Sequence, residues 1–394
     1  MASTPTEEVA VVQPSVVNHQ PAAARLISLD LLRGATIAAM ILVNNPGDEL
    51  ATYWPLQHAH WNGWTPTDLI FPFFLFISGV SMIYSLNSRL QRDESKGKLF
   101  RHVLWRGLVI AALGLFLSGF SVAYHFTHWR VYGVLQRIAV CYVISAALVL
   151  WTGRRTQILA ILGCLAGYWV LMRYVPVPGF GLPTHDIPLL DPDRNLVAWL
   201  DRRLLYGHLY EVTRDPEGLL STIPAIATSL LGALTGQWLR SARTAATKAL
   251  GMLAAGVVGI AAGEFFNLWF PINKKLWTSS FVLFTAGAAL VCLAVSYFAV
   301  DIKLWRGRWT KPFLVFGMNA IAAYFLAEML ALVISRMTTT VDGASFTWQE
   351  FIFQGAFAEL GSPAFASLLF ALLYVLFCWL VTWQLYRGKM FIKI

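Results

Sequence analysis

Charged residues are scarce in this sequence of 394 residues. They form 13% of the chain, whereas a soluble globular domain carries about a quarter. Hydrophobic residues reach 57%, which is more apolar surface than a soluble core can bury. The composition therefore excludes an ordinary soluble domain and favours an all-α, polytopic membrane helix bundle.

Cysteine is also rare, and the cysteines follow no ligand pattern. No two of them have the CxxC spacing of zinc or redox sites, and each lies inside an apolar run. We therefore expect neither a disulfide framework nor a metal site. The four cysteines are Cys141, Cys164, Cys292 and Cys378.

The beginning of the sequence lacks the positive residues and apolar stretch that a cleavable signal peptide needs. We interpret residues 1–24 as a flexible cytosolic tail. No internal repeat and no linker to a second domain follow. Residues 25–394 are therefore predicted to form one transmembrane domain.

Apolar runs that cross a bilayer as helices need about 20 residues each. By this criterion the chain has about ten predicted spans, and an even number places both termini on the same side. The predicted spans are Ile27–Asn44, Thr65–Leu86, Leu104–Ala123, Tyr132–Trp151, Gln157–Tyr174, Gly218–Leu239, Ala246–Phe266, Leu276–Val300, Pro312–Ile334 and Pro363–Tyr386.

Lysine and arginine gather in every second connection between these spans, so the positive-inside rule places those connections and both termini in the cytosol. The rule also explains the net charge of +9, and the expected partner is the lipid bilayer rather than nucleic acid. One connection, about 175–216, carries arginines against this pattern. It is predicted to be the largest extracytoplasmic segment, with a short amphipathic helix, Leu196–Leu205, on the membrane surface. The cytosolic basic residues are Arg25, Arg89, Arg92, Lys96, Lys98, Arg101, Arg154, Arg155, Arg240, Arg243, Lys248, Lys303, Arg306, Arg308, Lys311, Arg387, Lys389 and Lys393.

Two histidines, His58 and His60, stand just before the second predicted span. Imidazole titrates near neutral pH and serves as a base or a nucleophile. Thr65, Pro66 and Asp68 follow in the pattern of a helix start, in which Asp68 belongs to a capping box. Capping and a functional role are both open for Asp68, and His60 is a rival to His58.

Polar side chains inside spans are costly in lipid and indicate functional positions. Asp30 and Arg33 are three residues apart on one helical face, so either they form a local ion pair or Arg33 binds an anionic group in a cavity. Asn44 and Asn45 end the same span, as a cap or as groups that polarise a carbonyl. Buried pairing is the alternative for the other polar residues of the spans, which are Gln136, Arg137, Asn319 and Glu328.

Carboxylates and lysines stand at span ends on the predicted outer side. Asp215 and Glu217 have the pattern of a helix start, in which Asp215 caps and Glu217 favours the positive helix end. Alternatively, these acids and Asp68 form a vestibule that binds a cationic amine. Lys274 and Lys275 lie in a connection, where lysines are usually solvated.

Several blocks of residues occur along the chain in a fixed order. They are Arg25–Gly34, Asn44, His58–Gly63, Asp68–Pro72 with Phe76 and Gly79, Gly133–Arg137, Asp215–Gly218, Asn273–Trp277 and Gly317–Asn319. In this order they resemble the transmembrane acyltransferase family of heparan-alpha-glucosaminide N-acetyltransferase, and its bacterial NagX-type inner-membrane members in particular. The match runs from about Arg25 to the C-terminus.

The resemblance implies a homodimeric enzyme of the bacterial inner membrane that moves an acetyl group from cytosolic acetyl-CoA to a glucosamine-type amino sugar on the periplasmic side. The family's active histidine matches His58, and its nearby asparagine matches Asn44. His60 stands where the lysosomal enzyme has a small hydroxyl residue, so His60 could share the role. The lysosomal enzyme also has an N-terminal lumenal domain and span, and we expect this protein to lack both. We therefore expect a small amino sugar or an envelope glycan rather than heparan.

The resemblance and the polar residues together predict three groups of site residues. The first is expected to carry out catalysis, the second to bind acetyl-CoA and the third to bind the sugar. They are His58, Asn44 and Asp68; Arg33, Gln136, Arg137 and Asn319; and His60, Asn45, Glu217 and Lys275.

Two other functions stay open at this point. A transporter of amino sugars without chemistry would also need polar residues in its spans, although the chain shows no paired broken helices in matching halves. An O-acetyltransferase of envelope glycans would keep the chemistry and change the acceptor. Direct transfer and an acetyl-histidine intermediate are equally open.

Overall fold

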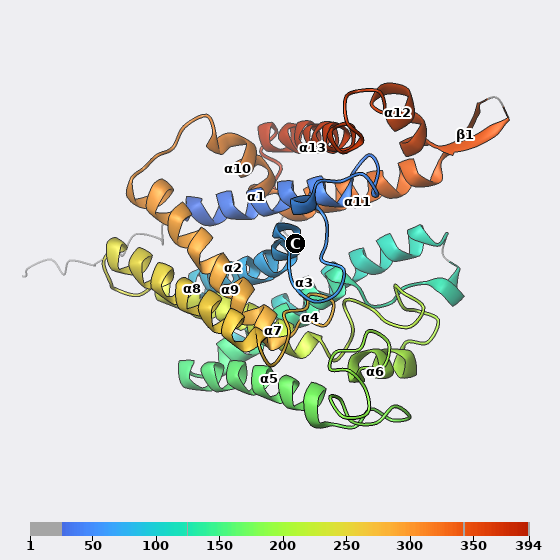
Figure 1. Ribbon diagram of the computed structural model, residues 1–394. Helices are drawn as coiled ribbons and strands as arrows, with labels where there is room; N and C mark the ends of the chain where they lie inside the picture. Colours follow the sequence, from blue (N-terminus) through green and yellow to red (C-terminus); the bar gives the residue numbers. More distant parts are fainter. Residues whose placement is uncertain (1–25, 124, 342, 393–394) are drawn as a thin grey trace, which may run out of the picture.

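The computed structural model describes residues 26–123, 125–341 and 343–392. The predicted tail, residues 1–24, and the basic residues Arg25 and Lys393 lie outside this part of the chain. Long helices run side by side across the molecule, and strand β1 and the short helix α6 lie at the same end of the bundle (Figure 1). The predicted all-α membrane class is confirmed.

The described residues form helices, short helical turns and one antiparallel hairpin. In chain order the elements are α1 (Ile27–Asn44), η1 (Trp54–Leu56), η2 (Pro66–Leu69), α2 (Ile70–Leu90), α3 (Lys96–Ser121), η3 (Phe126–His128), α4 (Val134–Trp151), α5 (Arg154–Tyr174), α6 (Leu196–Leu204), α7 (Thr222–Leu239), α8 (Ala245–Asn267), α9 (Ser279–Tyr297), η4 (Phe298–Ile302), α10 (Thr310–Met318), α11 (Ala320–Arg336), β1 (Thr338–Val341), β2 (Ala344–Thr347), α12 (Trp348–Ala356) and α13 (Pro363–Arg387).

Eight helices of the described residues are long and apolar enough to cross a membrane, and the bent pair α10 and α11 makes a ninth crossing if it counts as one span. The sequence predicted about ten spans. The difference is the predicted span Gly218–Leu239, which corresponds to α7. This helix has 18 residues and buries Thr228, Ser229 and Thr235 inside the protein.

The predicted span Pro312–Ile334 is not one helix. It breaks at Asn319 into α10 and α11, which are bent by 85°. Asn319 is fully buried, and its Oδ1 accepts a hydrogen bond from the backbone N–H of Ile392 at 3.1 Å. Gly317 packs directly on the backbone of Asp30, which joins α10 to α1. The sequence did not predict this bend, because a run of apolar residues does not reveal a break that distant contacts hold.

The bundle has two ends that we name by their residues. The backbone N–H of Asp48 donates to Ser367 Oγ at 3.0 Å, so the start of α13 lies beside the end of α1 and the two helices are antiparallel. We call the end where α1 begins and α13 finishes the basic face, because Arg387 lies in the last turn of α13 and Arg306 bonds to Asp301, which accepts the backbone N–H of Ser28 at the start of α1. We call the opposite end, which holds the loop between α1 and α2, the His58 face.

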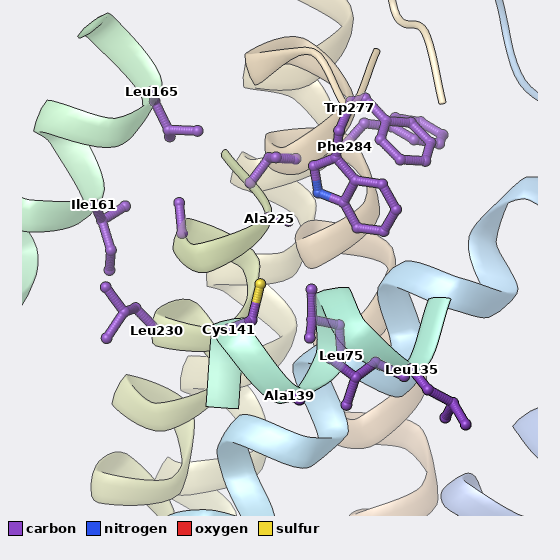
Figure 2. Close-up of a cluster of buried hydrophobic side chains, with 14 of the residues drawn as sticks. Leu75, Leu135, Ala139, Cys141, Ile161, Leu165, Ala225, Leu230, Trp277 and Phe284 are labelled. Atoms are coloured by element: carbon purple, nitrogen blue, oxygen red, sulfur yellow. The ribbon is translucent and has the colours of Figure 1, made fainter. Parts of the chain in front are cut away.

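The largest buried cluster surrounds Trp277, just before α9 (Figure 2). The indole ring lies edge-on to Phe71 and Phe281, and its Nε1 donates to Thr228 Oγ1 at 3.2 Å. Trp277 is 1% exposed. Because it stands three residues after Lys274, its burial anchors the loop that carries this lysine.

Helices α2 and α7 approach each other closely because glycines stand at the contact. A Cβ atom on Gly232 would overlap the carbonyl oxygen of Phe76, and one on Gly79 would overlap that of Ser229. Small residues let the backbones of membrane helices come together in this way. The contact fixes α2, whose first turn lies at the His58 face.

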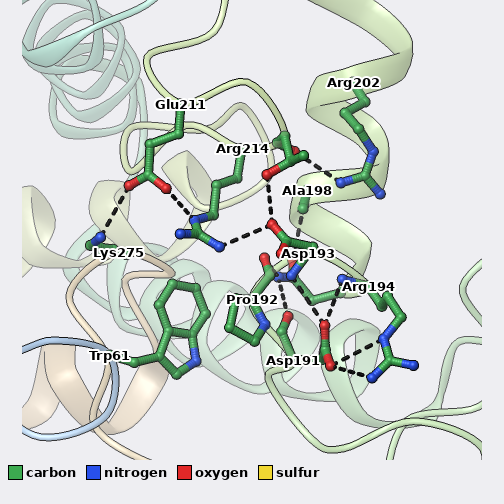
Figure 3. A network of polar contacts seen from close by, with 12 residues as sticks. Trp61, Asp191, Pro192, Asp193, Arg194, Ala198, Arg202, Glu211, Arg214 and Lys275 are labelled. Atoms are coloured by element: carbon green, nitrogen blue, oxygen red, sulfur yellow. Dashed lines mark hydrogen bonds and ion pairs between the residues drawn. The ribbon is translucent and has the colours of Figure 1, made fainter.

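The connection between α5 and α7 folds into a polar scaffold on the His58 face (Figure 3). Asn195 caps α6 by accepting the backbone N–H of Ala198 at 2.9 Å, and α6 covers nearly the predicted range. Asp201 of α6 is fully buried and accepts the N–H of Leu219 at 2.9 Å, just before α7. Burial raises the pKa of Asp201 to about 7, and the charge of Asp215 adds to this effect.

We expect Gly232→Ala to lower the apparent Tm of the purified protein, because the new methyl group forces α2 and α7 apart. Overpacking of this kind costs about 1–3 kcal/mol. The control is Gly163→Ala in α5, where a Cβ meets no atom within 4 Å and a helical alanine is favoured over glycine. Thermal unfolding followed by size exclusion measures both. Equal Tm values for the two variants would contradict the close contact.

Asp201 gives a second prediction, on the pH dependence of stability. Its pKa in the folded protein, about 7, lies above the ordinary value of 3.8. Protonation of Asp201 stabilises the folded protein fully when the pH is below the ordinary pKa of 3.8. This stabilisation is lost as the pH rises through about 7. Asp201→Asn cannot lose a proton, so its Tm should rise relative to the intact protein between pH 5 and pH 8. A Tm difference that is constant over this range would show that Asp201 is charged throughout.

Candidate active site

The loop before α2 builds the site around Asp68. Thr65 and Asp68 form the predicted capping box, in which Asp68 Oδ2 accepts the backbone N–H of Thr65 at 3.0 Å. The same oxygen accepts the backbone N–H of Ala59, also at 3.0 Å. The side chain of Asp68 is 1% exposed. These bonds hold the carboxylate in one orientation at the start of the helix.

The other carboxylate oxygen of Asp68 orients His58. Oδ1 lies 2.7 Å from His58 Nδ1, so an ionised Asp68 accepts the proton of that nitrogen. The tautomer with Nδ1–H leaves the acceptor lone pair on Nε2. The side chain of His58 is 49% exposed, and the ring borders a cavity. An oriented, accessible imidazole of this kind can act as a general base or as a nucleophile.

Lys274 is the third member of this cluster, and the expectation that it is solvated was wrong. Its Nζ lies 2.9 Å from His58 Nδ1, 3.4 Å from Nε2 and 3.4 Å from Asp68 Oδ1. The side chain is 21% exposed. Burial lowers the pKa of Lys274 below its ordinary value, although the charges of Asp68 and Glu217 act in the opposite direction.

The backbone around Lys274 is held from both sides. Asn273 Oδ1 accepts the N–H of Leu276 at 2.9 Å, and Asn273 Nδ2 donates to Asn62 Oδ1 at 3.1 Å. The backbone N–H of Gly63 donates to the carbonyl of Ile272 at 2.8 Å. These bonds join the loop before α9 to the loop of His58, which explains why two segments far apart in sequence meet here.

A continuous cavity of about 1150 Å³ extends from His58 into the bundle. At its other end it is lined by Arg89, His102 and Arg106, which belong to the end of α2 and to α3 near the basic face. Pockets for small ligands usually measure about 300–1,000 Å³. The cavity therefore joins the two faces and is large enough for an extended ligand.

Most of the predicted site residues line this cavity, and three do not. Arg137 is fully buried, donates to the carbonyl of Gly218 at 3.1 Å and lies over the ring of Trp277. Asn45 donates to the carbonyl of Ile41 at 2.8 Å. Asn319, at the helix break, is absent from the described lining. The residues that do line it are Arg33, Asn44, His58, His60, Asp68, Gln136, Glu217 and Lys275.

The ion pair predicted for Arg33 is confirmed, and the same residue lines the cavity. Its Nη1 forms the predicted ion pair with Asp30 at 3.0 Å and donates to the carbonyl of Gly317 at 3.2 Å. Its Nη2 donates to Ser81 Oγ at 2.5 Å, and the residue also lines the cavity. Glu328 lines the cavity as well.

Asp215 and Glu217, two of the acids at the outer mouth, are paired with an arginine. Arg130 forms ion pairs with Asp215 and with Glu217. Burial acts to lower the pKa of Arg130, but the two carboxylates outweigh it and raise the pKa above its ordinary value. Arg130 was missed from the sequence because it stands in a short loop about 85 residues away from the two acids.

A second polar network supports the same mouth (Figure 3). Lys275 Nζ lies 3.0 Å from Glu211 Oε1, and Glu211 also pairs with Arg214. The guanidinium of Arg214 lies over the ring of Trp61 and contacts Asp193 at 2.9 Å. The loop of His58 is thereby attached to the connection between α5 and α7.

Arg106 is the clearest residue of the inner half that sequence reasoning passed over. Its Nη1 lies 3.5 Å from Tyr142 Oη, and its guanidinium lies over the ring of Tyr142. Its Nε is buried and has no hydrogen-bond partner among the described residues. Arg106 lies inside the predicted span Leu104–Ala123, where a single arginine gave no motif to recognise.

Comparison with known proteins identifies the family of this chain. The family model of the heparan-alpha-glucosaminide N-acetyltransferase catalytic domain matches residues 25–262. The chain is 32% identical over 370 residues to heparan-alpha-glucosaminide N-acetyltransferase of Homo sapiens, covering 79% of this chain and 54% of that protein. The protein of the same name from Mus musculus is 32% identical over 379 residues, covering 80% of this chain and 56% of its own length. The chain thus spans about half the length of these relatives, and it belongs to the heparan-alpha-glucosaminide N-acetyltransferase catalytic-domain family.

Proposed function

We propose that this protein is a membrane acetyltransferase that uses acetyl-CoA on one side of a bilayer to acetylate the amine of a glucosamine-type sugar on the other. The observation that carries the proposal is the cavity that joins Arg89, His102 and Arg106 to His58. A donor and an acceptor on opposite sides need such a passage. The names of the relatives, both N-acetyltransferases, support the reaction class.

The basic end of the cavity fits the donor. Acetyl-CoA carries phosphate groups, and arginine binds phosphate through charge-assisted hydrogen bonds. The buried Nε of Arg106 offers a donor without a partner among the described residues. Arg33 and Gln136 line the same cavity and would contact the part of the donor that reaches toward His58.

His58 would act on the acceptor amine. As the amine nitrogen attacks the acetyl carbonyl carbon, His58 Nε2 takes one proton from the amine. The carbon–sulfur bond of the thioester breaks, and His58 returns the proton to the thiolate. The products are an N-acetyl sugar and the free thiol of CoA. In the acetyl-histidine alternative, Nε2 carries the acetyl group between two such transfers.

The other predicted residues would support this step. Asp68 holds the ring of His58 with Nδ1 as the donor. Asn44 lines the same cavity, and its amide would stabilise the oxyanion. His60, Glu217 and Lys275 also line the cavity and would contact the sugar. We place the basic face in the cytosol by the positive-inside rule, with the chain as a homodimer in a bacterial inner membrane.

Transport of amino sugars is the second candidate, and one observation favours it. The broken helix at Asn319 borders the cavity, and broken helices form the binding sites of many transporters. Uptake of labelled glucosamine by proteoliposomes without acetyl-CoA would support transport. An O-acetyltransferase would instead give a product that mild base cleaves, because an ester is hydrolysed more readily than an amide.

We expect His58→Ala to reduce acetyl transfer to glucosamine at least about 100-fold, because general-base catalysis contributes about 10²–10⁴. The measurement uses purified protein, radiolabelled acetyl-CoA and glucosamine. The control is His185→Ala, since His185 pairs with Asp186 in an exposed loop. His60→Ala, in the same loop as His58, shows whether the two histidines share the role. Full activity of His58→Ala would refute the mechanism.

We expect Arg106→Gln to weaken the binding of acetyl-CoA by about tenfold, since hydrogen bonds to charged groups contribute about 1.5–3 kcal/mol. Direct binding of radiolabelled acetyl-CoA measures the loss. Arg101→Gln, on the same helix but outside the described lining, is the matched control. Equal loss in both variants would indicate a general effect of charge at this face rather than a phosphate contact by Arg106.

A further inference from the structure

The side chains of His58, Asp68 and Lys274 contact one another at the His58 face. Asp68 Oδ1 lies 2.7 Å from His58 Nδ1, and Lys274 Nζ lies 2.9 Å from the same nitrogen. Lys274 also lies 3.4 Å from both His58 Nε2 and Asp68 Oδ1. The lysine therefore contacts the ring and its orienting carboxylate at once, which a freely solvated side chain would not do.

We propose that Lys274 is a positioning residue that offsets the charge of Asp68 and thereby keeps the imidazole of His58 neutral. The proposal rests on His58 as the reactive group of the proposed acetyl transfer, and it adds a role for a residue outside that chemistry. Lys274 does not take the proton of the acceptor. It sets the pH range over which His58 can take that proton.

The physical reason is the balance of charges around the ring. A carboxylate at 2.7 Å favours the positively charged imidazolium form of a histidine. A protonated imidazole has no lone pair and cannot act as a base or a nucleophile. An ammonium group beside the same ring disfavours the imidazolium by like-charge repulsion. With Lys274 present, Asp68 can fix the ring orientation and the tautomer without also protonating Nε2.

The other charged groups near this cluster do not replace Lys274. His60 belongs to the same loop as His58 and lines the same cavity. Lys275 is paired with Glu211 at 3.0 Å, and Glu217 is paired with Arg130. Among these groups, Lys274 is the one whose Nζ contacts both His58 and Asp68. Its loop is held by Asn273 and Trp277, so the contact is part of the fold.

The test reads the ionisation of His58 directly. Diethyl pyrocarbonate attacks the neutral imidazole but not the imidazolium, and peptide mass spectrometry with fragment ions separates His58 from His60. The rate of His58 modification is measured from pH 5 to pH 9 in the intact protein, Lys274→Met and Lys274→Arg. We expect Lys274→Met to move the midpoint of this profile upward by about one pH unit. Lys274→Arg, which keeps the positive charge, should restore it.

Lys275→Met is the matched control, because it removes one charge at the next residue while Lys275 is paired with Glu211. Its profile should move less than that of Lys274→Met. An unchanged or lowered midpoint in Lys274→Met would overturn the proposal, and so would an equal shift in Lys275→Met. A purely structural role would slow modification without moving the midpoint.

The same variants separate this proposal from the proposed enzyme activity. If the intact protein transfers acetyl groups, the pH–rate profile of Lys274→Met should shift in the same direction as its modification profile. If the intact protein transfers no acetyl group, the proposed function fails. The modification experiment then still decides whether Lys274 controls the charge of His58, because it needs neither acetyl-CoA nor an acceptor.

Discussion

The carboxylate of Asp68 takes part in two structures at once. One oxygen accepts the backbone N–H groups of Thr65 and Ala59, which start the helix and close the loop before it. The other oxygen accepts the Nδ1 proton of His58. Formation of the helix start therefore also orients the ring. Because the side chain of Asp68 is buried, loss of either set of bonds leaves an unpaired charge, and the fold and the candidate site depend on each other here.

The rest of the bundle keeps this helix start in place and leaves room beside it. Glycine contacts bring α2 against α7, and the cluster around Trp277 fixes the loop that carries Lys274. The break at Asn319 turns α11 away from the direction of α10. Residues of α1, α2 and α11 line the large cavity between the two faces. The tight contact of α2 with α7 and the bend before α11 leave space for it.

Several charged side chains at the His58 face form ion pairs. Arg130 is paired with Asp215 and Glu217, Lys275 with Glu211, and Arg214 with Glu211 and Asp193. Such pairs join the long connection before α7 to the loops of α2 and α9. In the cluster of His58, Asp68 and Lys274, the buried charge of Asp68 supports a histidine that is half exposed and lines the cavity. An accessible side chain that buried charges hold in one orientation is available to react with a ligand, whereas a purely stabilising ion pair does not need this access.

Local rules made part of this structure predictable from the sequence. The capping box of Thr65 and Asp68, the ion pair of Asp30 with Arg33 and the range of α6 all depend on residues within a few positions of each other, and all were confirmed. Composition determined the membrane class because apolar surface of this extent requires lipid. Tertiary structure alone decided the contact of Lys274 with His58, 216 positions apart, the pairing of Arg130 and the bend at Asn319. These features depend on which helices pack together, and a single sequence does not contain that information in any local pattern.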